Sequence, residues 1–277
     1  MLHPVFDIAS EELASAQWMR CRLLLELNRH FLQYVISEEK SLLCWKYYEL
    51  PAASPAEKMG MVESILQSDA LLHNSVKEQT IVYNFPKNCL LPGALYDPGQ
   101  GRPLLEIMQG DLQKGPVITE KVPGWNLYNV FRLPGGLDEL CKNHFPHAAF
   151  HHHASLWLAY LNKQQEGVHL LFSAYDMAIC VFHRQKLQLV QSYPYHDHDE
   201  LLYHLFNLFV RLRLNREQTP VYAAGMVQTD SPVYKELAKY FQRLKPTPLP
   251  EKFRVPGAFQ AVPEHFFSPL IKMSQCV

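Results

Sequence analysis

The sequence predicts an α/β protein made of two similar halves, in which mixed sheets are flanked by helices. The first observation is an order of segments: three strand-like runs, a helix, a strand and a further helix occur once near the start and again later. The second is that 277 residues with 48% hydrophobic side chains can fill two cores. We therefore expect two βββαβα halves, at residues 1–165 and 166–277.

In the first half, apolar runs separated by polar turns predict the strands. The three consecutive runs are CRLLLEL, HFLQYVIS and SLLCWKYYEL, and later strands are expected at TIVYNFP and WNLYNVFRLP. A helix should begin at Ser54, because Pro55 suits the first helical position and Glu57 completes a capping box. Its apolar stripe is Met59, Val62, Ile65 and Leu66. Further helices are expected over 136–144 and about 154–163.

In the second half, the same order returns. The strand candidates are GVHLLFSAY, MAICVFHR, KLQLVQSYPY and PVYAAGMV. Asp197 or Asp199 can cap the helix between the last two, and leucines at 201, 205, 208 and 212 form its apolar face. Ser231 and Pro232 open the last helix. The boundary between the halves is expected in the polar run 163–167, and the proline-rich tail 245–263 should lack regular structure.

Composition excludes several classes of protein. The formal net charge of -1 gives no field that would attract nucleic acid or anionic lipid. No window approaches the ~18 uninterrupted apolar residues of a membrane helix, and the first residues do not resemble a secretory signal. The six cysteines are scattered without a C-x-x-C pair, so we expect buried, reduced thiols. These features predict a cytoplasmic location, no membrane insertion and no nucleic-acid partner.

A family resemblance is carried by extended hydrophobic patterns along nearly the whole chain. The segments are LLLELNRHFLQYVI, LLPGALYD, the block from NVFRLP to HHHASLWL, the stretch from QLVQSYPYHDHDELLYHLF to PVYAAGMV, and PEHFFSPLIKM. In these the chain resembles the bacterial family known as domain of unknown function 3822. That resemblance implies a duplicated ribonuclease H-like fold, that of the actin-like ATPases, which include actin, sugar kinases, Hsp70 and the pilus assembly protein PilM. It informs fold more than activity.

In active members of that superfamily, a D-x-G turn after the first strand of each half holds nucleotide phosphates, because glycine lets the backbone approach them. Here the corresponding turns, 26–30 and 173–177, contain no glycine and carry the large side chains of Arg29 and Tyr175. The usual glycine-rich adenosine turn is reduced to Gly225. The resemblance therefore implies a degenerate nucleotide cleft with no cofactor and no catalytic residue. Its residues at cofactor-binding positions are Glu26, Asn28, Asp176 and Gly225.

The sequence also allows two enzymatic alternatives. The first is an unusual ATPase or kinase in which Glu26, Asp176 or Asp199 supplies the metal-organising carboxylate. Neither a P-loop nor a G-x-G-x-x-G motif supports it. The second is a metal-dependent hydrolase that uses the chain's many histidines, and no G-x-S-x-G elbow offers a covalent route instead.

The histidines form two groups. Five fall within ten residues, at positions 144, 147, 151, 152 and 153, on an expected strand-to-helix junction where neighbouring side chains face opposite sides. The second group, His196 and His198, stands among three acids at a helix start. Helix capping explains those acids without a metal. We therefore expect no metal, and His196 and His198 remain the weak candidates for one.

The overall prediction is a non-catalytic, PilM-like binding or assembly module with an unidentified protein partner. Exposed tyrosine and tryptophan side chains are common at protein interfaces, and the chain has aromatic residues in both halves. Phe259, Phe266 and Phe267 near the carboxyl terminus are expected to dock on a neighbouring surface. A homodimer is left open.

Overall fold

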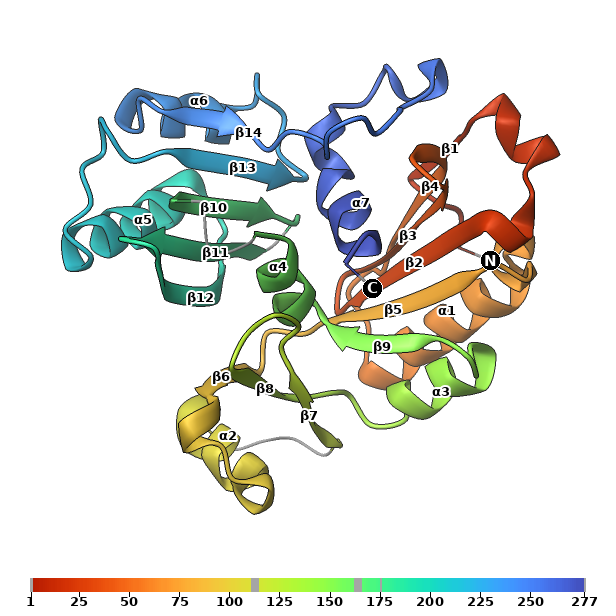
Figure 1. The fold of residues 1–277 in the computed structure, drawn as a ribbon, viewed down its shortest axis with the longest axis horizontal. Helices are drawn as coiled ribbons and strands as arrows, with labels where there is room; N and C mark the ends of the chain where they lie inside the picture. The colour runs from red at the N-terminus through yellow and green to blue at the C-terminus, as the bar shows by residue number, and fades with distance from the viewer. Residues whose placement is uncertain (1, 111–114, 162–165, 175, 277) are drawn as a thin grey trace. The chain divides into compact units, whose positions relative to one another are not determined.

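A computed structural model describes residues 2–110, 115–161, 166–174 and 176–276 (Figure 1). The chain divides into two compact units. The first comprises 1–160, 251–260 and 270–277, and the second comprises 161–250 and 261–269. Part of the expected boundary, residues 163–165, lies outside the described residues, as does Tyr175.

The first unit is built on a six-stranded sheet. Three strands form the predicted antiparallel meander, and β5 and β9 extend it in parallel, in the order β1-β4-β3-β2-β5-β9. The strands are β1 (Phe6–Ala9), β2 (Cys21–Asn28), β3 (Phe31–Glu38), β4 (Ser41–Glu49), β5 (Glu78–Asn84) and β9 (Ala149–His152). The predictions for β2 to β5 are confirmed, whereas β1, a short edge strand, was not predicted.

Helices α1 (Pro55–Ser68) and α3 (Leu137–His144) pack on one face of this sheet (Figure 1). The predicted capping box of α1 is confirmed: the Ser54 side chain accepts from the Glu57 amide, and the Glu57 carboxylate accepts from the Ser54 amide. Of the predicted stripe, Val62, Ile65 and Leu66 are buried, whereas Met59 is half-buried. Helix α4 (His153–Leu161) follows β9.

A small second sheet is inserted between β5 and α3. Its strands are β6 (Asn88–Pro92), β7 (Val117–Lys121) and β8 (Leu127–Arg132), in the order β6-β8-β7, and helix α2 (Gly101–Gln109) packs against it. Only β8 was predicted from the sequence. The glycine- and proline-rich stretch 91–103 concealed the end of β6 and the start of α2, because such residues usually mark loops.

The second unit repeats the strand order of the first. Its sheet runs β12-β11-β10-β13-β14, so that the third, second, first, fourth and fifth strands of the repeat occupy the places of β4, β3, β2, β5 and β9. The elements are β10 (Gly167–Phe172), β11 (Asp176–His183), β12 (Lys186–Pro194), α5 (His198–Arg211), β13 (Val221–Gly225), α6 (Pro232–Tyr240) and β14 (Leu244–Pro246). Except for β14, each was predicted. The leucine face of α5 is buried at 201, 205 and 208.

The carboxyl-terminal tail contributes to both units. Phe259 is buried in the first unit, whereas Phe266 and Phe267 are buried in the second. Helix α7 (Ser268–Ser274) follows and was not predicted, and from Leu270 onward the chain belongs to the first unit. There the Arg22 guanidinium donates to the Ser274 carbonyl at 3.4 Å. Within the described residues, no helix combines the length and apolarity needed to cross a membrane.

Candidate functional site at the ends of β2 and β5

Glu26 lies near the carboxyl end of β2, with its side chain buried among polar groups. One carboxylate oxygen accepts hydrogen bonds from Nδ1 of His153 and from the Asn84 amide, each at 2.8 Å. The other accepts from the Gln33 amide at 2.7 Å. Gln33 in turn accepts a hydrogen bond from the indole of Trp45 at 3.2 Å. We call these five residues the Glu26 cluster.

The Glu26 cluster keeps the carboxylate ionised. Burial would raise the pKa of Glu26, but the charge of His153 and the hydrogen bonds from His153, Gln33 and Asn84 outweigh it, so its pKa lies below the usual range. Only 3% of the residue is exposed. A metal ion would need these same oxygens, and each already accepts at least one strong hydrogen bond.

His153 joins the cluster at the start of α4. Its Nδ1 donates to Glu26, whereas its Nε2 is buried and has no hydrogen-bond partner within the described part of the chain. The ring packs 5.7 Å from that of Trp157, centroid to centroid. Nε2 therefore has unused capacity for one hydrogen bond, which a buried water could fill.

His152 is held as the neutral tautomer by two backbone contacts. Its Nε2–H donates to the Phe85 carbonyl at 2.9 Å, and its Nδ1 accepts from the Ala154 amide at 3.1 Å. Burial lowers its pKa to about 4, and the hydrogen bond to Phe85 only partly offsets this. Because Nδ1 already accepts a hydrogen bond, the ring cannot take up a proton without breaking the contact at the start of α4.

Of the other histidines between 144 and 153, two form hydrogen bonds with different partners. Nδ1 of His151 donates to the Glu120 carboxylate at 3.0 Å, and Nδ1 of His144 donates to the Leu140 carbonyl at 3.0 Å. His147 is exposed. No group of three or more His, Cys, Asp or Glu side chains suited to a metal occurs in the described residues. The strand-to-helix junction thus spreads these histidines over separate structural roles.

The glycine-free turn between β2 and β3 is stabilised by Asn28. Its amide nitrogen donates to the Asn84 carbonyl at 2.9 Å, and its oxygen accepts from the His30 amide at 3.0 Å. Lys58 donates to the Arg29 carbonyl at 2.7 Å. An Asx-type bond therefore performs the turn-forming role that glycine often has.

In the second unit, the predicted cofactor-binding residues Asp176 and Gly225 both have roles in backbone structure. The Asp176 amide donates to the Ser173 hydroxyl at 3.0 Å, and the Asp176 carbonyl accepts from the Ser173 amide at 2.8 Å. Gly225 has φ of 81°, and a Cβ there would lie 2.1 Å from the Phe172 carbonyl oxygen. Close packing of the ends of β10 and β13 thus requires this glycine.

His196 and His198 lie at the exposed start of α5. Asp197 caps the helix by accepting from the Glu200 amide at 2.9 Å, as predicted. The Glu200 carboxylate accepts from the His196 amide at 3.0 Å, one residue earlier than in a capping box. Nε2 of His198 lies 3.3 Å from the Asp199 carboxylate. Asp197 and Glu200 therefore act at the helix start, whereas Asp199 pairs with His198.

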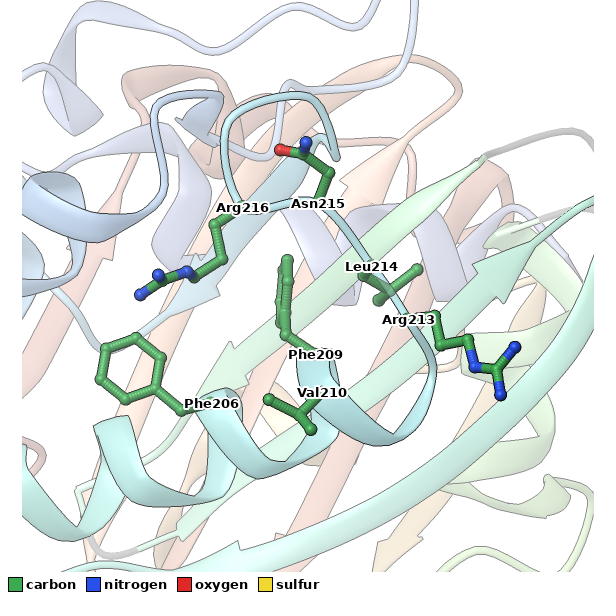
Figure 2. Close-up of a pocket in the computed structure, with 7 residues that line it drawn as sticks. All are labelled: Phe206, Phe209, Val210, Arg213, Leu214, Asn215 and Arg216. Carbon is green, nitrogen blue, oxygen red and sulfur yellow. The ribbon is translucent and has the colours of Figure 1, made fainter.

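A recess of about 490 Å³ lies at the carboxyl end of α5 in the second unit (Figure 2). Phe206, Phe209 and Val210 form its apolar side, and Arg213 and Arg216 border it. The Arg216 guanidinium lies 5.2 Å from the centre of the Phe206 ring, a cation–π distance.

Sequence reasoning identified Glu26 and Asn28 but not their partners. Gln33 and Asn84 carried no visible signal, since amides within strand patterns are common. His153 was noticed only as one of five histidines. Its meeting with Glu26 joins residues 127 positions apart, which spacing along the chain does not reveal.

Comparisons with known proteins identify the family and the fold of this chain. A model of the family described as "Protein of unknown function (DUF3822)" matches residues 10–244. No curated protein matches the chain significantly. Among solved structures, a Bacteroides thetaiotaomicron protein with actin-like ATPase fold and unknown function gives a TM-score of 0.71 at 14% identity, covering 83% of this chain and 92% of that one.

A second structure, the PilM-PilN type IV pilus biogenesis complex, gives a TM-score of 0.52 at 13% identity and covers 92% of this chain and 96% of that one. At such identities the likeness shows the fold alone, and it confirms the predicted fold class. The chain belongs to the DUF3822 family of proteins of unknown function and has the actin-like ATPase fold.

Proposed function

We propose that this chain is a binding or assembly module that does not hydrolyse ATP. The supporting observation is the Glu26 cluster: the carboxylate at the end of β2 is buried and holds the first unit together through Gln33, Asn84 and His153. A metal-organising carboxylate must instead face the ligand. Gly225 likewise serves strand packing.

Nucleotide titration tests this proposal. Calorimetry with ATP and magnesium should show no binding in the micromolar range, and phosphate release should equal that of a protein-free sample. The Glu26→Gln variant should behave identically. Micromolar ATP binding by the natural chain would overturn the proposal, and loss of that binding in Glu26→Gln or of turnover in Asp176→Asn would favour the ATPase alternative.

A surface suited to a protein partner lies on α5 of the second unit. Tyr203 and Val210 are 65% and 77% exposed, and with Phe206 they follow one another at helical spacing. The recess beside them is bordered by Arg213 and Arg216 and has no acidic lining residue (Figure 2). Aromatic and arginine side chains are enriched at interfaces. The charge favours a partner segment that carries acidic residues beside an apolar one.

The partner can be sought with a photoreactive amino acid at position 203 in the native host. We expect one protein adduct at position 203, and none at position 107, where Ile107 is equally apolar and 80% exposed. Val210→Glu should remove the adduct. Identical adducts at both positions, or none at 203, would contradict a partner site on α5.

Two further points support a cytoplasmic module. All six cysteines are free thiols, as expected in a reducing compartment. One neighbour in fold is by its name part of a type IV pilus biogenesis complex, which is an assembly role for that protein.

A further inference from the structure

A cavity of about 760 Å³ lies in the first unit beside the first turn of α1. Five segments line it: the turn after β2, the residues after β4, the start of α1, the residues after β5, and the stretch from the end of β8 to the start of α3. Leu27, which packs in the core with α1, is one lining residue, whereas its neighbour Glu26 is not. Successive side chains of a strand face opposite sides, so the cavity is separate from the Glu26 cluster.

Basic side chains dominate the polar lining of this cavity. Arg29, Lys58, Lys87 and Arg132 each come from a different one of these segments, and the lining includes no aspartate or glutamate. The Lys58 amine donates to the Arg29 carbonyl at 2.7 Å, and the Lys87 amine donates to the Gln109 carbonyl at 3.2 Å. These acceptors are neutral, so neither contact cancels the charge of its lysine.

The pKa of Lys58 reflects both its burial and a second positive charge nearby. Burial lowers the pKa of Lys58, and the nearby charge of Arg29 lowers it further. The start of α1 also lines the cavity through Pro55 and Ala56, and a helix amino terminus carries a partial positive charge. An anion in the cavity would offset the charge of Lys58 and the partial charge of the helix start.

The floor of the cavity is apolar. Leu50, Phe85 and Leu137 are 3%, 9% and 4% exposed and line it together with Val62. Its volume falls within the range of small-molecule sites, about 300–1,000 Å³. A ligand that fills it would combine an apolar body with a negative group.

We propose that this cavity binds a small organic anion that carries a carboxylate or phosphate group on an apolar body. Lys58 and Lys87 hold the negative group, and Leu50, Phe85 and Leu137 contact the body. Glu26 takes no part, so this site goes beyond the proposed assembly role and stands or falls independently of it.

Calorimetry of the full chain with three eight-carbon probes tests the site. Octyl phosphate and octanoate present the two negative groups, and 1-octanol presents the body alone. At least one anion should bind saturably at one site per chain, about tenfold tighter than octanol, since hydrogen bonds to charged groups contribute that much. The affinity should fall as salt rises. Comparing the affinities of octyl phosphate and octanoate shows which negative group the cavity prefers.

Variants identify the location of binding. Lys58→Gln and Lys87→Gln should each weaken the anion about tenfold while leaving octanol unchanged. Lys121→Gln, at an exposed residue outside the lining, is the matched control. Ala56→Trp, at an exposed position at the start of α1, should block all three probes while circular dichroism remains unchanged.

Three results would overturn the site: no saturable binding of either anion, equal affinity for octanol and the anions, or undiminished anion affinity in both lysine variants. ATP binding that persists undiminished in Lys58→Gln and Lys87→Gln bears only on the proposed assembly role.

Discussion

The two sheets share one strand order but close their strand ends with different chemistry. In the first unit, the last residue pair between the first and fourth strands of the repeat is Asn28–Asn84. In the second unit it is Phe172–Gly225. Two residues earlier, the position of Glu26 is occupied by Leu170, which is 1% exposed. The first unit therefore has a polar network at the strand ends where the second unit has an apolar contact.

This difference shows two ways to hold parallel strand ends together. The polar end depends on an ionised carboxylate and every donor that surrounds it, because a buried charge without partners is costly. The apolar end depends on one glycine, because no larger residue fits against the Phe172 carbonyl. A substitution in the first unit should therefore act through charge, and one in the second unit through overlap of atoms.

The chain allows the two units to be followed separately. All four tryptophans, at 18, 45, 125 and 157, belong to the first unit. Tryptophan fluorescence during urea unfolding thus reports on the first unit. Hydrogen exchange of peptides from β10 and β13 reports on the second.

The largest effect is expected from His153→Ala. Removing the imidazole leaves the Glu26 carboxylate buried with two neutral donors, and breaking such a pair costs about 3–5 kcal/mol of unfolding free energy. Fluorescence-detected urea unfolding measures the loss. Adding Glu26→Gln to this variant should restore about 1–2 kcal/mol, since it removes the uncompensated charge. A double variant less stable than His153→Ala alone would show that charge is not the cause.

Gly225→Ala should destabilise the second unit by about 3 kcal/mol, since a left-handed backbone alone costs an L residue about 1–2 kcal/mol and the Cβ overlap adds to it. Hydrogen exchange in β10 and β13 should accelerate, while the tryptophan transition reports on the other unit. Gly60→Ala is the matched control: Gly60 lies within α1 with no atom near its would-be Cβ, and alanine there should stabilise by about 1 kcal/mol. Equal effects of the two substitutions would refute the packing explanation for Gly225.

The polar end should also make the first unit sensitive to acid. The pKa of His152 is lowered to about 4 in the folded protein, so the unfolded chain binds more protons between that value and about 6.5. The stability of the first unit is therefore complete above pH 6.5 and falls as pH decreases, by about 2 kcal/mol at pH 5. The lowered pKa of Glu26 acts in the same direction, but only below about 4.5.

The His152→Gln variant isolates this contribution. Its fluorescence-detected stability should be lower at pH 7 but nearly constant between pH 6.5 and 5, since the titrating ring is gone. His147→Gln, at an exposed residue, should keep the slope of the natural chain. An unchanged slope in His152→Gln would exclude that histidine as the source.

How much the sequence predicted depended on how local each signal was. The strands of both meanders and the caps at Ser54 and Asp197 were correct because alternation and capping act within a few residues. Edge strands such as β1 and β14 escaped, because their pairing partners lie far along the chain or their length is only three residues. The Glu26 cluster could not be predicted for a related reason: β2, β3, β4, β5 and α4 each supply one of its residues, and only the folded chain joins them.

The smallest loss of stability is expected from substitutions at the N-caps of α1 and α5, the helices that follow the two meanders. Helix α1 has a complete capping box at Ser54, whereas α5 has a cap at Asp197 whose Glu200 reaches back to His196 instead. Ser54→Ala and Asp197→Ala should each cost about 1 kcal/mol, as loss of an N-cap acceptor usually does. Ser54→Ala should lower the midpoint of the tryptophan transition, and Asp197→Ala should accelerate exchange in the first turn of α5. Ser54→Thr and Asp197→Asn, which keep an acceptor oxygen, should be nearly neutral. If the conservative variants cost as much as the alanine variants, the capping bonds do not set the stability of either helix start.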